Sequence, residues 1–155
     1  MEREDQQMPS DSQLYLDQLK SMPGHLIRRL QQHSTAVFSE VMQRYDLTSV
    51  QLVALVAIFE ATELDATRLS ELIHFDRATI GGVIARLEQK GLIKREVSSV
   101  DKRIKILRTT RAGEAMIRLC QEDVERVQGR ILSPLSTAEV ATFMELTARI
   151  IAHPK

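Results

Sequence analysis

Cysteine is nearly absent from this sequence. Cys120 is the single cysteine among 155 residues, so no intrachain disulfide can form. It falls in a predicted helix beside Met116, Leu119 and Val124, where a cysteine is more often a small buried apolar group than a reactive one. Oxidant sensing by Cys120 stays open as an alternative, but it would need an exposed, electropositive setting.

Long apolar runs are also missing. The longest runs from Leu52 to Phe59, far short of the roughly 20 residues that a membrane-spanning helix needs. The sequence starts with Met-Glu-Arg-Glu-Asp, which is acidic and unlike the basic start of a secretory leader. We therefore expect a cytoplasmic protein that does not associate with membranes.

Enzyme motifs are absent as well. The sequence has no glycine-rich phosphate loop, no Gly-x-Ser-x-Gly, no His-Glu-x-x-His and no paired acid and base. Metal binding by His25 and His33 would lack the cysteine or nearby carboxylate that completes a usual ligand set. We expect no catalytic residues, no metal and no cofactor. With 43% hydrophobic residues, the chain can bury one ordinary core.

What is present centres on residues 67–113, which predict two short helices and a basic hairpin. In the second helix Asp76 is the expected N-cap, and Gly91 closes it. Apolar residues recur between them at helical spacing and predict one buried face: Ile80, Val83, Ile84 and Leu87. The segment 69–75 before it predicts a shorter helix, with only His74, Phe75 and Asp76 left for the turn between the two. The pair predicts a helix-turn-helix whose second helix enters a major groove.

The opposite face of this second helix is expected to meet DNA. The expected contacts there are Arg77, Ala78, Thr79, Gly81, Gly82 and Arg86. Glycine inside a helix costs up to about 1 kcal/mol against alanine. The benefit of two adjacent glycines would be close approach of the helix backbone to a grooved surface.

After Gly91 the sequence period changes from 3.6 to 2. Residues 93–97 and 103–108 predict two strands joined by a polar tip, residues 98–102. A helix-turn-helix followed by such a hairpin is a winged helix. The predicted fold is therefore mainly α with a small β wing, flanked by N- and C-terminal dimerisation helices.

Two motifs in and after the hairpin resemble the MarR family of bacterial transcriptional regulators. Asp101-Lys102-Arg103 is similar to that family's Asp-x-Arg wing, and Thr110-Arg111-Ala112-Gly113 to its Thr-x-x-Gly helix start. Residues 76–79 and 87–93 resemble its recognition helix and the exit from it. Thr109 departs from the pattern, because the family usually has leucine there. The resemblance implies a homodimeric, ligand-responsive transcriptional repressor.

Charge supports DNA binding independently of this resemblance. Residues 77–111 contain ten Lys or Arg and three acids, a net charge of +7, whereas the whole chain balances 21 basic against 21 acidic residues. Positive charge gathered in one segment is typical of a surface that contacts phosphates. In the hairpin we expect Lys102, Arg103 and Lys105 to contact DNA. The alternative is a winged-helix interaction module that uses the same hairpin to bind protein.

Asp101 is expected to orient the wing. Its carboxylate can hold the guanidinium of Arg103 by charge-assisted hydrogen bonds. An arginine held in this way can be presented to a narrow minor groove, as the corresponding residue of the MarR family is. The alternative is an ordinary surface salt bridge.

The predicted organisation has four segments: a flexible N-terminus (1–12), N-terminal helices broken at Met22-Pro23-Gly24 (13–46), the winged helix (47–110) and C-terminal helices (111–155). Capping boxes predict helix starts at Thr48 and Ser136. The terminal helices have more apolar surface than one winged helix can cover, which favours a homodimer. Two-fold symmetry would place the recognition helices about 34 Å apart on a palindromic operator. The alternative is that these helices enlarge the domain's own core.

A cationic cluster in the N-terminal helix is the candidate effector site: His25, Arg28, Arg29 and His33. Their spacing gathers them on one side of a helix, where they could hold a carboxylate. MarR proteins commonly bind aromatic acids between this helix, the next helix and the long helix after the wing. Residues 25–29 further resemble regulators of nicotinate and related aromatic-acid breakdown, which suggests a hydroxynicotinate effector. The alternative is a solvated or dimer-interface face.

Overall fold

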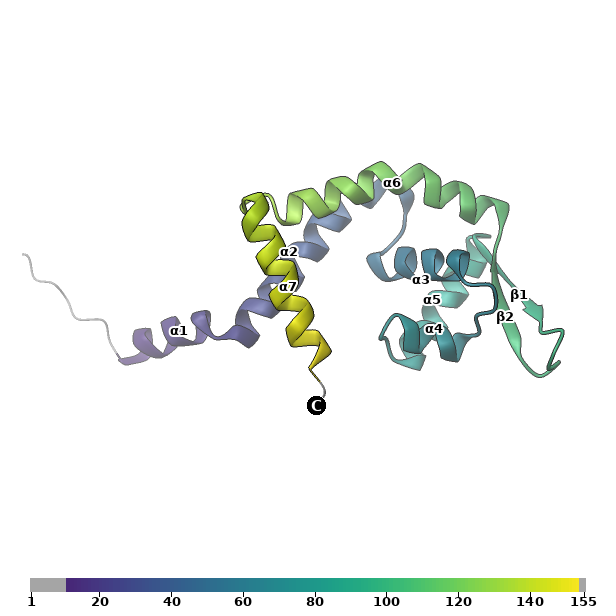
Figure 1. The fold of residues 1–155 in the computed structure, drawn as a ribbon, viewed down its shortest axis with the longest axis horizontal. Coiled ribbons are helices and arrows are strands. Elements are labelled where there is room, and N and C mark those ends of the chain that lie inside the picture. The colour runs from purple at the N-terminus through teal and green to yellow at the C-terminus, as the bar shows by residue number, and fades with distance from the viewer. Residues whose placement is uncertain (1–10, 154–155) are drawn as a thin grey trace, which may run out of the picture. The chain divides into compact units, whose positions relative to one another are not determined.

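The computed structural model describes residues 11–153, which form helices and one small hairpin (Figure 1). The elements are α1 (Asp11–Ser21), α2 (Pro23–Met42), the short 3-10 helix η1 (Gln43–Tyr45), α3 (Ser49–Glu60), α4 (Ala66–Leu72), α5 (Arg77–Gln89), β1 (Ile93–Val97), β2 (Lys105–Thr109), α6 (Arg111–Ile131) and α7 (Thr137–Ala152). The two strands pair antiparallel. This confirms the predicted mainly α fold with a β wing.

Two compact units divide the chain, residues 1–36 and 37–155, and the boundary falls within α2. The first unit contains α1 and the start of α2, which are separated at Met22 as the Pro23-Gly24 pair predicts. The second contains the winged helix together with α6 and α7. The predicted division by role into segments 13–46, 47–110 and 111–155 stays a prediction.

The predicted flexible N-terminus lies mostly outside the described residues. The structure describes the chain from residue 11 onward, and Asp11 and Ser12 already belong to α1. The first helix therefore begins two residues before the predicted start at Gln13. Helix ends are the least sharply specified part of such a pattern, because no apolar periodicity marks them.

Capping residues start the helices of the second unit where the sequence predicts. Thr48 and Gln51 form a reciprocal capping box at α3, and Ser136 and Glu139 form another at α7. Thr110 accepts a hydrogen bond from the Gly113 amide and starts α6. These side chains accept from backbone N–H groups that have no partner within the helix.

The first helix of the helix-turn-helix starts earlier than predicted. Asp65, which lies four residues before the segment 69–75, caps α4 by accepting from the amides of Thr67 and Arg68 at 2.8 and 2.9 Å. The helix ends at Leu72, next to the predicted turn at residues 74–76, and the Ser70 hydroxyl donates to the Phe75 carbonyl oxygen within that turn at 2.6 Å. Only the start of the helix is therefore displaced, by about one turn.

The core of the second unit lies where α3, α4, α5 and the hairpin meet. Leu55, Leu69 and Ile84 are almost fully buried, as is Leu107 of β2. The Leu107 amide also donates to the Leu64 carbonyl at 2.8 Å, so the segment after α3 is fastened to the hairpin. The three helices and the wing are thereby joined into one support for the recognition surface.

The last helix, α7, has no buried residue. Large apolar side chains remain exposed on it, namely Met144, Leu146, Ile150 and Ile151, the last two at 71% and 77%. The apolar residues of α2 divide into two groups: Val37 and Phe38 are buried, whereas Leu26, Ile27 and Leu30 are exposed. Both terminal segments therefore present uncovered apolar surface in the single chain.

Candidate nucleic-acid interface

The recognition helix α5 is anchored at its first turn by Asp76. The Asp76 carboxylate accepts from the Thr79 amide at 2.9 Å and from the Thr79 hydroxyl at 2.5 Å. These two hydrogen bonds lower the pKa of Asp76, with the hydroxyl the largest cause. All four predicted core residues of the helix are buried: Ile80, Val83, Ile84 and Leu87. The sequence pattern therefore separated the two faces of α5 correctly.

All six residues that the sequence assigns to the DNA-facing side of α5 are exposed: Arg77, Ala78, Thr79, Gly81, Gly82 and Arg86. A Cβ built at Gly81 or Gly82 would meet nothing within 4 Å. Neither glycine is therefore required by packing within the chain. Their effect is to leave an open backbone surface in the middle of the recognition face.

At the wing, Asp101 holds Arg103 by two side-chain hydrogen bonds. Arg103 Nε donates to Asp101 Oδ1 at 3.1 Å, and a terminal guanidinium nitrogen donates to Oδ2 at 2.9 Å. This contact lowers the pKa of the Asp101 carboxyl and raises that of Arg103. The Arg103 side chain is 90% exposed. The predicted clamp is present, and it holds an arginine that remains free to meet a partner.

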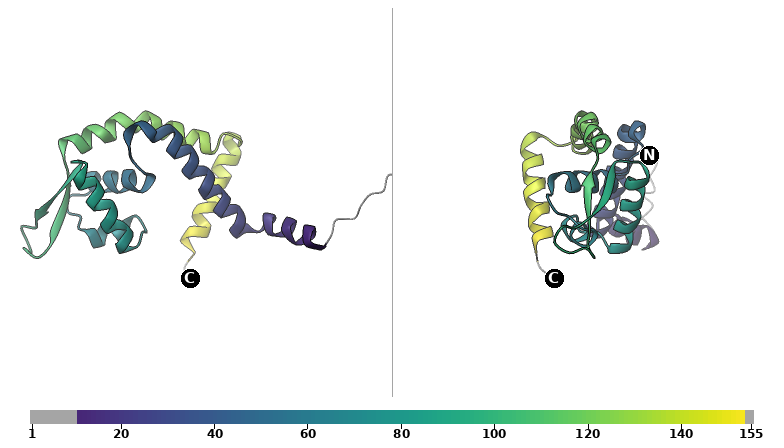
Figure 2. Two further views of the ribbon diagram at one scale, coloured as in Figure 1. Left: turned by 180° about the vertical axis from the view of Figure 1, so that it is seen from behind. Right: turned by 90° about the vertical axis from the view of Figure 1, so that its right-hand side faces the viewer.

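The two strands support this tip. Ile93 pairs with Thr109 and Val97 with Lys105, and Figure 1 and the left view of Figure 2 show the turn between β1 and β2 projecting away from α3, α4 and α5. Lys102 and Lys105 are exposed, as expected of phosphate contacts.

Besides Arg103, four of the ten cations in the basic segment are engaged within the chain. Lys90 donates to the Asp46 carbonyl and lies 2.8 Å from the Asp46 carboxylate, so it ties the end of α5 to the start of α3. The other three are ion-paired in or beside the hairpin: Lys94 and Arg108 with Glu96, and Arg95 with Glu88. Counting charge along the sequence could not separate these from the free cations, because their partners are set by folding.

The predicted effector residues lie in the first unit, on α2. His25 is half-buried, whereas Arg28, Arg29 and His33 are exposed. One contact joins two of them: a guanidinium nitrogen of Arg28 lies 3.5 Å from His25 Nδ1. The spacing therefore brings His25 and Arg28 together, and the assignment of this cluster to an effector stays a prediction.

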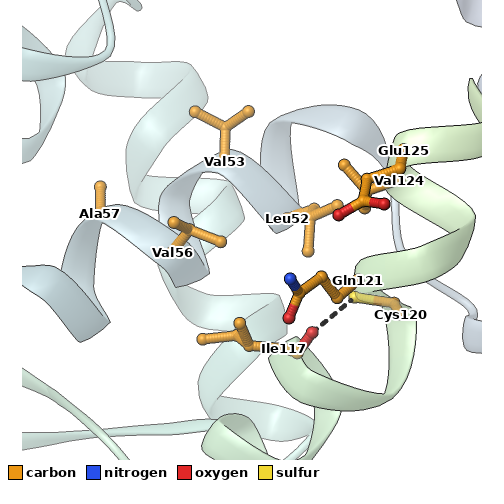
Figure 3. A pocket seen from close by; sticks show the side chains of 9 residues that line it. All are labelled: Leu52, Val53, Val56, Ala57, Ile117, Cys120, Gln121, Val124 and Glu125. Carbon is orange, nitrogen blue, oxygen red and sulfur yellow. Dashed lines mark hydrogen bonds between the residues drawn. The ribbon is translucent and has the colours of Figure 1, made fainter. Parts of the chain in front are cut away.

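A pocket lies between α3 and α6, two of the three helices between which the family resemblance implies an effector site, but none of its lining residues was predicted (Figure 3). Its volume is about 540 Å³, and its lining is mostly apolar: Leu52, Val53, Val56, Ala57, Ile117, Cys120, Gln121, Val124 and Glu125. None of these side chains is positively charged. The sequence signal for these lining residues was the uninterrupted apolar run Leu52–Phe59. A helix that is apolar on every side needs other segments or a ligand to cover all of its faces.

Cys120 lines this pocket but is only 1% exposed, as predicted for a small buried residue. Burial raises the pKa of its thiol. A raised pKa keeps the sulfur as the unreactive thiol at neutral pH. The structure therefore disfavours the alternative of oxidant sensing at this cysteine.

Neither a metal site nor a membrane-spanning helix is present in the part of the chain that the structure describes. No group of three or more His, Cys, Asp or Glu is placed there to hold a metal ion. In the same part of the chain, no helix is long and apolar enough to cross a membrane.

Comparison with known proteins gives a consistent result. The model of the MarR family matches residues 47–105. The transcriptional regulator HosA of Escherichia coli is 29% identical over 133 residues, which are 86% of this chain and 97% of HosA. The PcaV transcriptional regulator from Streptomyces coelicolor, solved in complex with its natural ligand, is 30% identical with a TM-score of 0.79, covering 94% of this chain and 97% of PcaV.

A third protein shares the fold. It is BpsR of Bordetella bronchiseptica, whose DNA binding is regulated by 6-hydroxynicotinic acid, at 24% identity and a TM-score of 0.83 over 87% of this chain and 96% of BpsR. The matches to the family model, HosA and PcaV cover the winged helix and extend over most of the chain. They show that the chain belongs to the MarR family, whose members are transcriptional regulators and not enzymes.

Proposed function

We propose that the chain is a homodimeric, sequence-specific DNA-binding repressor that a small aromatic carboxylate releases from its operator. The observation that carries DNA binding is the exposure of the recognition face of α5 together with the clamped, 90% exposed Arg103. Such a regulator would act in the bacterial cytoplasm, where operators are found.

Each exposed group has a role in this proposal. The first turn of α5, with Arg77 and Thr79, reaches base edges in the major groove. Gly81 and Gly82 admit the DNA backbone or base edges close to the helix. Arg103 enters the adjacent minor groove, and Lys102 and Lys105 contact phosphates.

Dimerisation through the terminal helices is the second part of the proposal. The exposed apolar residues of α7, with Ile150 and Ile151 the most exposed, support it because such surface is costly in water. A two-fold axis then gives one recognition helix to each half of a palindromic operator.

The effector part has two candidate sites, and the structure supports each separately. The apolar pocket between α3 and α6 suits an aromatic ring, but Glu125 at its edge would repel a carboxylate. The cationic cluster of His25, Arg28, Arg29 and His33 suits a carboxylate. PcaV has a natural ligand and BpsR responds to 6-hydroxynicotinic acid, which guides the choice of probes.

DNA binding is tested with a labelled duplex from the upstream region of its own gene, titrated with protein at several salt concentrations. We expect affinity to fall roughly a hundredfold or more between 50 and 200 mM salt, because several phosphate contacts release counterions. Addition of 6-hydroxynicotinate, nicotinate or salicylate is expected to weaken binding by about 5- to 150-fold. Absence of binding at low salt would contradict DNA binding itself. Tight binding that none of the three acids changes would contradict only the effector class.

Glu125→Gln separates the two effector sites. If a carboxylate ligand occupies the α3–α6 pocket, removing the Glu125 charge is expected to lower the concentration needed for release by about two- to fivefold. The matched control is Glu122→Gln, an equal charge change at an exposed position of α6 outside the pocket lining. Arg29→Ala tests the cationic cluster of α2. We expect this variant to bind DNA with unchanged affinity but to be released less readily by the aromatic acid. Unchanged release in both variants would place the effector elsewhere.

A further inference from the structure

The tip of the wing is organised around a buried serine. Ser98 follows directly after β1 and is only 8% exposed, although it lies at the root of an exposed turn. Its hydroxyl oxygen accepts from two successive amides, Val100 N at 3.2 Å and Asp101 N at 3.3 Å. A serine hydroxyl placed in this way fixes the backbone of the turn that follows it.

The backbone closes the same turn from both ends. The Ser98 amide donates to the Ile104 carbonyl at 3.0 Å, and the Ile104 amide donates to the Asp101 carbonyl at 2.9 Å. The Arg103 amide donates to Asp101 Oδ1 at 2.9 Å. The Asp101 residue is therefore held through its amide, its carbonyl and its carboxylate before it contacts the Arg103 guanidinium.

We propose that Ser98 is a positioning residue for Arg103, whose buried hydroxyl fixes the turn from which Asp101 presents the guanidinium to a minor groove. This inference rests on the proposed function, because it concerns how the wing meets DNA. A hairpin tip is ordinarily mobile, and ordering it on binding would cost conformational entropy. The hydrogen bonds of Ser98 lower that cost because they order the tip beforehand.

The experiment is a double-mutant cycle on Ser98→Ala, Arg103→Ala and the double variant. The probe is a fluorescent duplex selected from a random-sequence pool by the wild-type protein. We expect Arg103→Ala to weaken binding about tenfold or more, and Ser98→Ala to weaken it about two- to tenfold, the range of one net hydrogen-bond contribution. The double variant should bind no more weakly than Arg103→Ala alone, because Ser98 acts through Arg103.

A second readout separates positioning from general stability. The flank that the wing would contact is replaced once by an A-tract and once by a G·C run, since an arginine in the minor groove prefers the narrow A-tract. Ser98→Ala is expected to lose that preference, as Arg103→Ala does, while the midpoint of thermal unfolding stays within about 2 °C of wild type. The matched control is Ser99→Ala, because the neighbouring Ser99 is exposed and makes no side-chain hydrogen bond among residues 11–153. Its affinity and flank preference should equal those of wild type.

Other outcomes are distinguishable. Wild-type affinity in Ser98→Ala, or a loss that adds in full to that of Arg103→Ala, would overturn the inference while leaving DNA binding intact. Ser98→Thr keeps the hydroxyl and should retain the flank preference; loss in both Ser98 variants would assign the effect to packing and overturn the inference as well. If Arg103→Ala binds like wild type, the wing role proposed above fails, and if wild type selects no duplex, the proposed function fails.

Discussion

Replacing Gly113 with alanine is expected to lower the free energy of unfolding by about 3 kcal/mol, the upper range for overpacking a well-filled site. An added Cβ would lie 2.1 Å from the Leu92 carbonyl oxygen and 2.7 Å from Thr109 Cγ2. Both contacts are far inside van der Waals distance, and the first is with backbone that cannot swing away. The start of α6 would have to move.

That movement would also break the junction between α5, the wing and α6. The Thr110 amide donates to the same Leu92 carbonyl at 3.0 Å, and the Thr110 hydroxyl donates to the Gly91 carbonyl at 2.6 Å. Thr109, which stands where leucine is usual in the family, fits here through its small methyl group, and its buried hydroxyl has no hydrogen-bond partner among the described residues. A glycine at 113 is thus required by close packing and not by a positive φ.

Gly129→Ala is the matched control in the same helix. A Cβ at Gly129 would meet nothing within 4 Å, so alanine there is expected to raise the free energy of unfolding by about 0.5–1 kcal/mol through helix propensity. Denaturant unfolding of the two variants measures the contrast. Equal effects of the two substitutions would show that α6 shifts at little cost and would contradict the packing argument.

Asp123→Asn is expected to give the second large effect, lowering the midpoint of thermal unfolding by roughly 10 °C. The Asp123 side chain is 1% exposed in the middle of α6. Its Oδ2 accepts from the Tyr45 hydroxyl at 2.8 Å and from Arg44, and its Oδ1 lies 2.7 Å from Arg126. An amide would leave two arginines beside a neutral group and would weaken the connection between η1 and α6, although the Tyr45 hydroxyl also donates to the Leu119 carbonyl at 3.1 Å.

The contribution of Asp123 to the free energy of unfolding should depend on pH. The Tyr45 hydrogen bond, followed by Arg44 and Arg126, lowers the pKa of Asp123 below its usual value although burial opposes this. A carboxyl whose pKa is lower in the folded state stabilises the fold above its unfolded pKa, about 3.9, and loses that contribution as pH falls through the folded value. The stability difference between wild type and Asp123→Asn should therefore be constant above about pH 5 and shrink only below about pH 3.9.

Glu122→Gln controls for the pH dependence, because Glu122 is the adjacent carboxylate of α6 and is exposed. We expect its unfolding midpoint to follow that of wild type. Thermal unfolding of the three proteins from pH 3 to pH 8 gives the comparison. A difference between wild type and Asp123→Asn that already shrinks at pH 6 would mean that the pKa of Asp123 is raised, which would contradict the assignment of this carboxylate as an ionised centre.

Local sequence signals were sufficient to predict the recognition helix α5 and the tip of the wing. Asp76 caps α5 and Gly91, with φ +69°, ends it, and both follow from short-range backbone chemistry that any chain context would preserve. The Asp101–Arg103 clamp is equally local, because two residues in one turn need no distant partner. Asp65 is an equally local cap, but it was not predicted, because apolar spacing alone was used to place the start of that helix.

The fold class, the capped recognition helix, its buried and exposed faces and the clamped wing arginine were all predictable from the sequence, because each depends on periodicity or on contacts within a few residues. Only the folded chain shows which cations stay free, that Asp123 is buried and which residues line the pocket between α3 and α6. These depend on partners such as Asp46 for Lys90 and Tyr45 for Asp123, which lie 44 and 78 residues away along the chain. No local pattern specifies such pairs, since they form only when packing brings distant segments together.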